Sequence, residues 1–440
     1  MSVMTETARL PRLLAGVRPE GAVTLEDHLA IHGPAPVPAK RRRRGDTELI
    51  DELQRAGLKG RGGAGFPTAV KMHAVLGARG RARAVVVNAT EGEPASLKDR
   101  TLLRTVPHLA LDGAVLAAHA VGAGEVLLCV SEASAETARS AQQAIAERGR
   151  LAGDVDIRLV AAPHTYVSGQ ETALVNFLNG GPALPTFTPP MTFEKGVGGR
   201  PTLFSNAETF AHLALIARHG ADWFRSLGTP EDPGSALVTM TGPVAHPGVY
   251  EIEHGSSLAS LIDAAGGLRE DVRAVLVGGY AGAWIDGAEL DSIALDEVSL
   301  AAYGATLGAG VVCLLGARGC GVAETVRVAR WMSEESAGQC GPCVHGLDAV
   351  AGRLAELAGG AVGYEGAERI GRLASVIRGR GACRHPDGTM RFVTSAMSVF
   401  APELADHARH GQCAACGARP TLPLPRLSQA PSAALQELSR

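Results

Sequence analysis

Six of the eight cysteines lie in the last third of the chain, where their thiolates could hold a metal ion or a cluster. Cys340 and Cys343 are separated by Gly-Pro, so a turn between two helices would let both sulfurs face one soft metal. Cys383, in GRGACRHPDG, is a remote third ligand. Because four ligands are usual, this spacing leaves open an iron–sulfur cluster, a zinc ion or unligated thiols.

The other cysteines fall into two groups. Cys413 and Cys416 form a second CxxC, which could be a redox pair, half of a zinc site or the donor of a missing ligand to the first group. Cys129 and Cys313 lie inside the apolar runs GEVLLCVS and AGVVCLLG, so we expect them to be buried and inert. All eight thiols are expected to be reduced, because the chain shows no secretion signal.

A dense glycine loop is the second candidate for chemistry. Gly60, Gly62 and Gly65 match the pattern GxGxxG, in which bare backbone allows N–H groups to approach a phosphate at a helix start. A predicted helix precedes the loop, whereas a strand precedes the Rossmann fingerprint. No Gly-Lys-Ser/Thr follows, which excludes a P-loop.

The polar loop 88–100 contains the third candidate group and follows a predicted strand, where α/β proteins place ligand contacts. Asn88 could hydrogen-bond the edge of a heterocycle, and Glu91 and Glu93 could accept bonds from amide or ribose donors. The alternative is a solvated turn.

Helical and strand patterns alternate through the first half of the chain, which predicts helices packed on a largely parallel sheet. The predicted elements are a helix at 46–56, a strand at 84–87, a helix at 109–121, a strand at 125–130, a helix at 133–147 and a strand at 155–161.

Composition shifts predict five regions. An extended segment, 1–45, precedes an α/β domain at 46–230. The stretch TPEDPG is typical of a linker, and a small α+β module is expected at 236–312. A helical bundle bearing cysteines follows at 318–410. The Pro-rich tail, 411–440, is expected to be ordered only if its CxxC binds something.

Composition and charge exclude several functions. Aromatic residues make up only 4% of the 440 residues, too few for stacking single-stranded nucleic acid. The net charge of −3 does not indicate binding to the phosphate backbone of a nucleic acid. The basic run 41–44 (RRRR) is expected to be solvated. No stretch reaches the ~18–20 apolar residues of a membrane span, and a cytoplasmic protein is expected.

Several of these motifs together resemble the NADH-binding flavin subunit of respiratory complex I, the bacterial F-type protein, and its relatives in hydrogenases and formate dehydrogenases. The matching stretches are GLKGRGGAGFPTAVK, NATEGEPASLKDR, YVSGQETALVNFLNG, PTLFSNAET and SAGQCGPC. GPVAHPGVYEI is similar to the family's ubiquitin-like SLBB module. The resemblance spans about residues 48–407 and implies an α/β FMN-binding domain, an SLBB-type module and a helical bundle with an iron–sulfur site.

The resemblance also implies a function. FMN would accept hydride from NAD(P)H with no side chain acting as acid or base, and single electrons would leave through the cluster to a ferredoxin-like or thioredoxin-like iron–sulfur protein or another redox subunit. Glu93 would contact the nicotinamide amide, and Cys340, Cys343 and Cys383 would bind the cluster. The residues implied at the flavin and nucleotide site are Gly60, Arg61, Gly62, Gly63, Ala64, Gly65, Phe66, Lys71, Asn88, Glu91, Glu93, Tyr166, Gly169, Glu171, Asn206 and Thr209.

The chain departs from the family at the cluster. Ala337 replaces the first cysteine, so the cluster would be 3Fe–4S, absent, or 4Fe–4S with a fourth ligand from solvent, His345, Cys320 or the pair Cys413 and Cys416.

The chain also departs from the family at the flavin and nucleotide site, where contacts with the cofactors would be lost. Thr90, Gln170 and Ser205 replace polar residues near flavin, and Ala74 and Met191 replace adenine-stacking aromatics. Two alternatives therefore accompany the enzyme hypothesis: a flavin and iron–sulfur carrier that a protein donor reduces, with weak or no NADH use, and a degenerate structural subunit.

Overall fold

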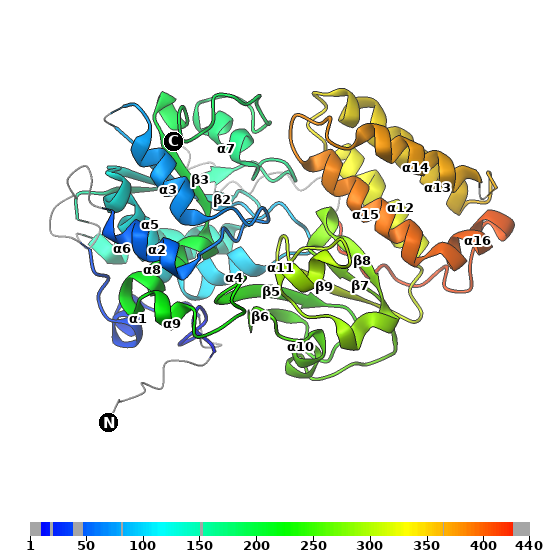
Figure 1. Cartoon of the computed structure of the whole chain (residues 1–440), viewed down its shortest axis with the longest axis horizontal. Coiled ribbons are helices and arrows are strands. Elements are labelled where there is room, and N and C mark those ends of the chain that lie inside the picture. The colour runs from blue at the N-terminus through cyan, green and yellow to red at the C-terminus, as the bar shows by residue number, and fades with distance from the viewer. Residues whose placement is uncertain are drawn as a thin grey trace.

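The computed structural model describes residues 10–17, 21–37, 47–80, 82–149, 153–363 and 365–425. The basic run 41–44 lies outside these ranges. Two sheets and a helical bundle make up the described chain, in that order along the sequence (Figure 1). In the described part, no helix is both long and apolar enough to cross a bilayer.

The first sheet is parallel throughout, with the order β3-β2-β1-β4. Its central strands are nearly continuous apolar runs, as expected for strands covered on both faces. Asn88 and Asn206 are register partners at the carboxyl ends of β1 and β4, so both amides lie at one edge of the sheet. The strands are β1 (Ala84–Ala89), β2 (Glu125–Ser131), β3 (Asp156–Ala162) and β4 (Thr202–Asn206).

Helices cover this sheet, and α5 (Pro107–Val121) is buried along its whole length. It packs closely on α8 (Ala207–His219), because a small residue, Gly113, faces the backbone of Phe210. The remaining helices of this domain are α1 (Leu25–His32), α2 (Glu48–Ala56), α3 (Thr68–Gly77), α4 (Lys98–Thr105), α6 (Ala135–Arg148), α7 (Glu171–Leu178) and α9 (Ala221–Phe224).

The second sheet is mixed, with the order β6-β5-β9-β7-β8, and forms the predicted small α+β module. Its inner face buries an apolar cluster around α10 (Leu258–Ala264) and α11 (Glu297–Ala301). The strands are β5 (Ser235–Thr241), β6 (Gly248–Glu253), β7 (Val272–Val277), β8 (Ala283–Asp286) and β9 (Val311–Gly316).

The bundle packs against the other face of this second sheet, where Leu276, Trp284 and Cys313 belong to the bundle's apolar cluster (Figure 1). Trp284 of β8 contacts the rings of Phe392 and Phe400, with centroid distances of 6.1 and 5.2 Å. The helices are α12 (Gly321–Glu334), α13 (Asp348–Ala358), α14 (Glu365–Ile377), α15 (His385–Val399) and α16 (Ala401–His410), with a π-helical turn at Pro342–Leu347.

The predicted order of fold classes is confirmed, and Cys129 and Cys313 are fully buried in β2 and β9 as expected. The prediction of an extended segment at 1–45 is wrong for residues 25–32, which form α1. Thr24 caps this helix, and buried His28 contacts Asp112 of α5 at 2.8 Å. Sequence periodicity did not reveal α1, because Leu29 and Ile31 stay exposed and the residue that the helix buries is a histidine, His28.

Candidate functional site

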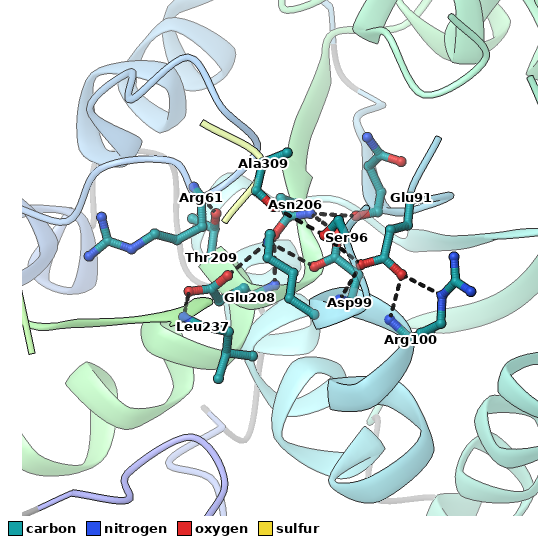
Figure 2. A network of polar contacts seen from close by, with 12 residues as sticks. Arg61, Glu91, Ser96, Asp99, Arg100, Asn206, Glu208, Thr209, Leu237 and Ala309 are labelled. Atoms are coloured by element: carbon teal, nitrogen blue, oxygen red, sulfur yellow. Dashed lines mark hydrogen bonds and ion pairs between the residues drawn. The ribbon is translucent and has the colours of Figure 1, made fainter. Parts of the chain in front are cut away.

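The glycine loop lies exposed above the carboxyl edge of the parallel sheet. The backbone from Gly62 to Phe66 is exposed, and a Cβ added to Gly62 would sit 3.4 Å from that of Asn206. The Arg61 N–H donates to the Thr209 hydroxyl at 2.9 Å, which anchors the loop to α8 (Figure 2). Gly65 has a φ of +62°, and open space surrounds it. The loop therefore offers bare backbone to a ligand.

The two asparagines at the strand ends are fixed by their neighbours. The Asn88 amide donates to the Gly169 carbonyl at 2.9 Å, and the Thr90 hydroxyl donates to Asn88 Oδ1 at 2.8 Å. A Cβ on Gly169 would come within 2.5 Å of Thr90, so only glycine fits there. Asn206 caps α8 through its Oδ1, and its amide donates to Asp99 at 2.6 Å.

A buried charge network lies directly beneath this edge (Figure 2). The Lys98 ammonium donates to Asp99 at 3.0 Å, to Glu208 at 2.8 Å and to Asn206 at 3.1 Å. Burial alone would raise the pKa of Glu208, but the Lys98 charge lowers it to about 2. The second Glu208 oxygen accepts from the Leu237 N–H at 2.9 Å, which ties the network to β5. The ends of β1 and β4 are thereby held at fixed positions.

Glu91 is engaged within its own loop. Its carboxylate accepts from the Ser96 hydroxyl at 3.0 Å, from the Asp99 N–H at 2.9 Å and from the Arg100 guanidinium at 2.8 Å (Figure 2). It is also a non-glycine residue with positive φ, 45°. The structure therefore gives Glu91 a role in shaping the loop at the start of α4.

Glu93 lies where the three parts of the molecule meet. It is buried and accepts from the Tyr280 N–H at 2.8 Å, from the Ala95 N–H at 3.3 Å and from the Tyr166 hydroxyl at 3.5 Å. Burial raises the pKa of Glu93 to about 7. A Cβ on Gly279 would lie 2.6 Å from its carboxylate, so the second module covers it closely.

Tyr166 connects this point to the bundle. Its ring makes edge contacts with Trp331 of α12 and His385 of α15, at centroid distances of 5.5 and 5.3 Å. Its backbone N–H donates to Glu335 at 2.9 Å. Since His385 is two residues after Cys383, packed side chains run from Glu93 to the cysteine region.

Lys71 and Glu171 form an ion pair of 3.0 Å at the other side of the glycine loop, and the Lys71 ammonium also donates to the Phe204 carbonyl at 3.0 Å. Phe66, at the end of the loop, is half exposed. Gln170 caps α7 by accepting from the Thr172 and Ala173 N–H groups, at 2.8 and 2.9 Å. The sixteen sequence-predicted residues thus gather around one sheet edge, with Glu91 and Thr209 facing inward.

Cys340, Cys343 and Cys383, the predicted cluster ligands, lie near one another in the structure. Burial raises the pKa of Cys343 to about 12, and the neighbouring Cys340 and Cys383 thiols contribute in the same direction. Cys340 precedes the π-helical turn, and Cys383 lies in the loop between α14 and α15. Three thiols from two loops can therefore face one soft metal centre.

Cys320, Cys413 and Cys416, which the sequence left open as donors of a fourth ligand, form a group of their own in the structure. Their sulfurs are drawn together with His407, all four donor atoms lying within 4.8 Å of one another. Each is already shared within that separate group, where α12 begins and α16 ends. His345 remains in the π-helical turn, two residues after Cys343.

Three family matches cover these regions. Residues 53–215 match the Nuo51 FMN-binding domain, residues 237–282 the SLBB domain, and residues 323–407 the NADH-ubiquinone oxidoreductase-F iron-sulfur binding region. The second F-type NADH-quinone oxidoreductase subunit of Rhizobium meliloti (strain 1021) is 32% identical over 379 residues, covering 83% of this chain and 90% of that protein. The chain belongs to the F-type family of NADH-quinone oxidoreductase subunits.

Relatives in hydrogenases extend the family. The NADP-reducing hydrogenase protein HndC of Solidesulfovibrio fructosivorans is 29% identical, covering 89% of this chain and 82% of that protein. A crystal structure of an NAD+-reducing [NiFe]-hydrogenase in the air-oxidized state superposes with a TM-score of 0.76 at 31% identity. The superposition covers 85% of this chain and 64% of the hydrogenase chain, so this chain spans less than two thirds of that protein's length.

The residues of this F-type family member fit both implied groups. Exposed glycine backbone, the Lys71 ammonium and the Asn88 amide can donate to a flavin phosphate and to ring carbonyls. Both N–H groups of the Asn206 amide are bonded to Asp99 and to the Asn88 carbonyl, so Asn206 holds the sheet edge in place. Three thiols supply soft ligands for iron. The chain is thus an FMN-binding and iron–sulfur-binding electron-transfer subunit. A cavity of about 100 Å³ beneath the loop, lined partly by Lys98 and Glu208, is too small for a flavin, since cofactor pockets hold about 300–1,000 Å³.

Sequence reasoning assigned no role to several residues that complete the site of this F-type protein. The two motif stretches NATEGEPASLKDR and PTLFSNAET contain the charged residues Lys98, Asp99 and Glu208. Charged residues that follow a predicted strand could have indicated that these side chains belong to the site. Tyr280 and Trp331 gave no comparable signal, because only the packing of distant segments brings them to Glu93 and Tyr166.

Proposed function

We propose that the residues around the sheet edge bind FMN and NAD(P)H, with Glu91 and Thr209 supporting them from the protein side. We also propose that Cys340, Cys343 and Cys383 bind the cluster, and that the domain limits are 46–230, 236–312 and 318–410. The observation that carries this proposal is the exposed glycine loop above Asn88 and Asn206, with buried Glu93 beside it. Bound FMN would accept hydride from the nicotinamide and release electrons singly.

The chain's own residues would bind and orient. The glycine loop would receive phosphate on its backbone N–H groups, and Lys71 would supply a positive charge next to it. Glu93 would accept a hydrogen bond from the nicotinamide amide, in competition with the Tyr166 hydroxyl. The Tyr280 N–H would keep this carboxylate in position. No residue would need to transfer a proton.

The adenine end of the nucleotide would find different partners from those of the family. Met191 is 43% exposed, and Phe187, four residues earlier, is 80% exposed. The Thr186 N–H donates to the Thr172 hydroxyl at 2.9 Å, which fixes this segment to α7. We therefore assign adenine stacking to Phe187, with the exposed Phe66 of the glycine loop as a second aromatic face.

An anaerobic NADH titration of the FMN-loaded chain, followed by visible absorption, tests the function. Bleaching of the flavin band near stoichiometric NADH is expected. Phe187→Ala should weaken the apparent affinity about two- to tenfold, because a stacking contact contributes about 0.5–1.5 kcal/mol. Val298→Ala, at another exposed apolar residue in the second module, is the matched control and should have no effect.

One second candidate has an observation in its favour. Ala74 and Met191 offer no aromatic face, which favours a subunit that receives electrons from a protein donor and uses NADH weakly. A flavin band that dithionite bleaches and NADH does not would establish this alternative. A chain that binds no FMN at all would contradict both candidates.

The electron partner would dock beside Cys383. Exposed Arg378, Arg384 and Arg391 line a surface cavity of about 590 Å³ between α15 and the second module. Asp387 is an acidic residue at its rim, paired with Arg384 at 3.1 Å. Such a basic rim complements an acidic ferredoxin-like or thioredoxin-like iron–sulfur protein. All eight cysteines are free in the structure, which further supports a cytoplasmic location.

A further inference from the structure

Four metal-binding side chains outside the proposed cluster converge from distant parts of the chain. Cys320 caps the N-terminus of α12, His407 lies in the last turn of α16, and Cys413 and Cys416 follow in the turn after it. Their donor atoms all lie within 4.8 Å of one another. Contacts of this kind between residues 320 and 413 require the tail to fold back onto the start of the bundle.

The spacing of the donor atoms is that of a tetrahedron around one ion. The three sulfur pairs lie 3.5, 3.8 and 3.8 Å apart, and His407 Nε2 lies 3.4 Å from both Cys320 and Cys416. Zinc bonds of about 2.3 Å to sulfur and about 2.0–2.1 Å to nitrogen place tetrahedral ligands about 3.8 and about 3.6 Å apart. The four ligands of a 4Fe–4S cluster bind four different iron atoms and therefore stand farther apart than this.

Hydrogen bonds around the group orient it for metal binding. The Nδ1–H of His407 donates to the Ala358 carbonyl at 2.7 Å, which leaves the Nε2 lone pair directed at the three sulfurs. Cys320 Sγ accepts from the Ala323 N–H, and Cys416 Sγ accepts from the Cys413 N–H, both at 3.3 Å. These N–H groups stabilise thiolates, which is the form that binds a metal.

We propose that Cys320, His407, Cys413 and Cys416 bind one structural Zn²⁺, separate from the iron–sulfur cluster. Three thiolates and an imidazole in closed tetrahedral geometry favour zinc, and no position remains for water or substrate. The alternative is a redox disulfide between Cys413 and Cys416, which would remove two of the four ligands. The structure favours the metal site, because both sulfurs also contact Cys320, a third thiol that such a disulfide would leave out.

The ion would hold residues 417–425 against α12 and the second module. Beyond Cys416 the chain runs back from α16 (Figure 1), and Leu422 is 1% exposed. The Thr421 and Leu422 N–H groups donate to Glu324 of α12. The Tyr280 hydroxyl donates to the Pro423 carbonyl, and the Tyr280 N–H holds Glu93. The zinc site thus secures the segment that packs behind Tyr280.

Elemental analysis of the full chain, purified without chelator and under anaerobic conditions, tests the site. One zinc per chain is expected in addition to iron. Cys413→Ser and His407→Ala should lose zinc and keep iron, whereas Cys340→Ser should lose iron and keep zinc. Cys129→Ala, at a buried thiol of the first sheet, is the control and should keep both metals.

Two further measurements apply if the zinc-deficient variants do not fold. His407→Cys preserves four ligands and should retain zinc, and cobalt-substituted wild type should show the visible bands of tetrahedral thiolate cobalt. Zinc content unchanged by Cys413→Ser and His407→Ala, iron lost from Cys413→Ser, or a Cys413–Cys416 disulfide in the anaerobic protein would each overturn the proposal. None of these outcomes depends on FMN or NADH binding.

Discussion

Glu93 is the buried carboxyl group of the proposed nicotinamide site, and its charge depends on pH. Burial raises its pKa to about 7 from an ordinary value of 4.5, so the folded protein binds one proton more than the unfolded chain between these two pH values. The contribution of this group to stability is therefore complete below about pH 4.5 and is lost as the pH rises through about 7.

Glu93→Gln should remove this pH dependence, because the amide carries no charge at any pH. Relative to the variant, the wild type should lose on the order of 3 kcal/mol of unfolding free energy between pH 4.5 and 7.5. Urea unfolding of both proteins across that range measures the difference. Parallel pH profiles for the two proteins would show that the carboxyl group is not buried as described.

Ala337 determines how many cysteines can bind the proposed iron–sulfur cluster. It stands three residues before Cys340, and a methyl group cannot ligate iron. Ala337→Cys should raise the iron content of the anaerobically purified chain toward four per chain, since the new thiolate would supply a fourth ligand. Iron and sulfide analysis measures this. Iron that stays constant in the variant would mean that a fourth ligand already exists or that no cluster forms.

At the scale of elements, the flavin site depends on how closely α5 and α8 pack. A Cβ on Gly113 would lie 1.7 Å from the Phe210 carbonyl oxygen, and this oxygen belongs to the backbone of α8. Since α8 carries Asn206 at its cap and Thr209 in its first turn, any displacement of α8 would move two residues of the proposed site.

Gly113→Ala should therefore destabilise the chain by about 1–3 kcal/mol or more through overpacking, and should weaken FMN retention. Gly371→Ala is the matched control, because Gly371 is an exposed position inside α14 with open space around its Cα. It should stabilise the chain by up to about 1 kcal/mol through helix propensity. Thermal unfolding with and without FMN distinguishes the two, and equal effects would contradict the close packing of α5 on α8.

At the scale of the whole molecule, residues from all three parts of the chain pack against one another between Glu93 and the cysteine region. The first domain supplies Glu93 and Tyr166, the second module supplies Tyr280, and the bundle supplies Trp331 and the cysteines. The proposed docking rim at Arg378, Arg384 and Arg391 lies at the outer end of this series of residues.

Charge reversal at this rim should slow electron delivery. Arg384→Glu is expected to lower the rate at which the NADH-reduced chain reduces an acidic 2Fe–2S ferredoxin about tenfold or more at low ionic strength, with a smaller effect at high salt. Stopped-flow absorption measures the rate. Arg104→Glu, at an exposed arginine of α4 on the first domain, is the control. A rate equally insensitive to both substitutions would place the partner elsewhere.

The sequence alone determined the parallel sheet, the glycine loop and the polar residues at its edge. Apolar runs and motif spacing are local signals, and the carboxyl ends of parallel strands necessarily share one edge. Only the tertiary structure decided that α1 forms, that Tyr280 holds Glu93, and that Cys320 and His407 join Cys413 and Cys416. A periodic pattern shows that a face is buried but not which distant segment buries it, so a contact such as that between Cys320 and Cys413 had to come from packing.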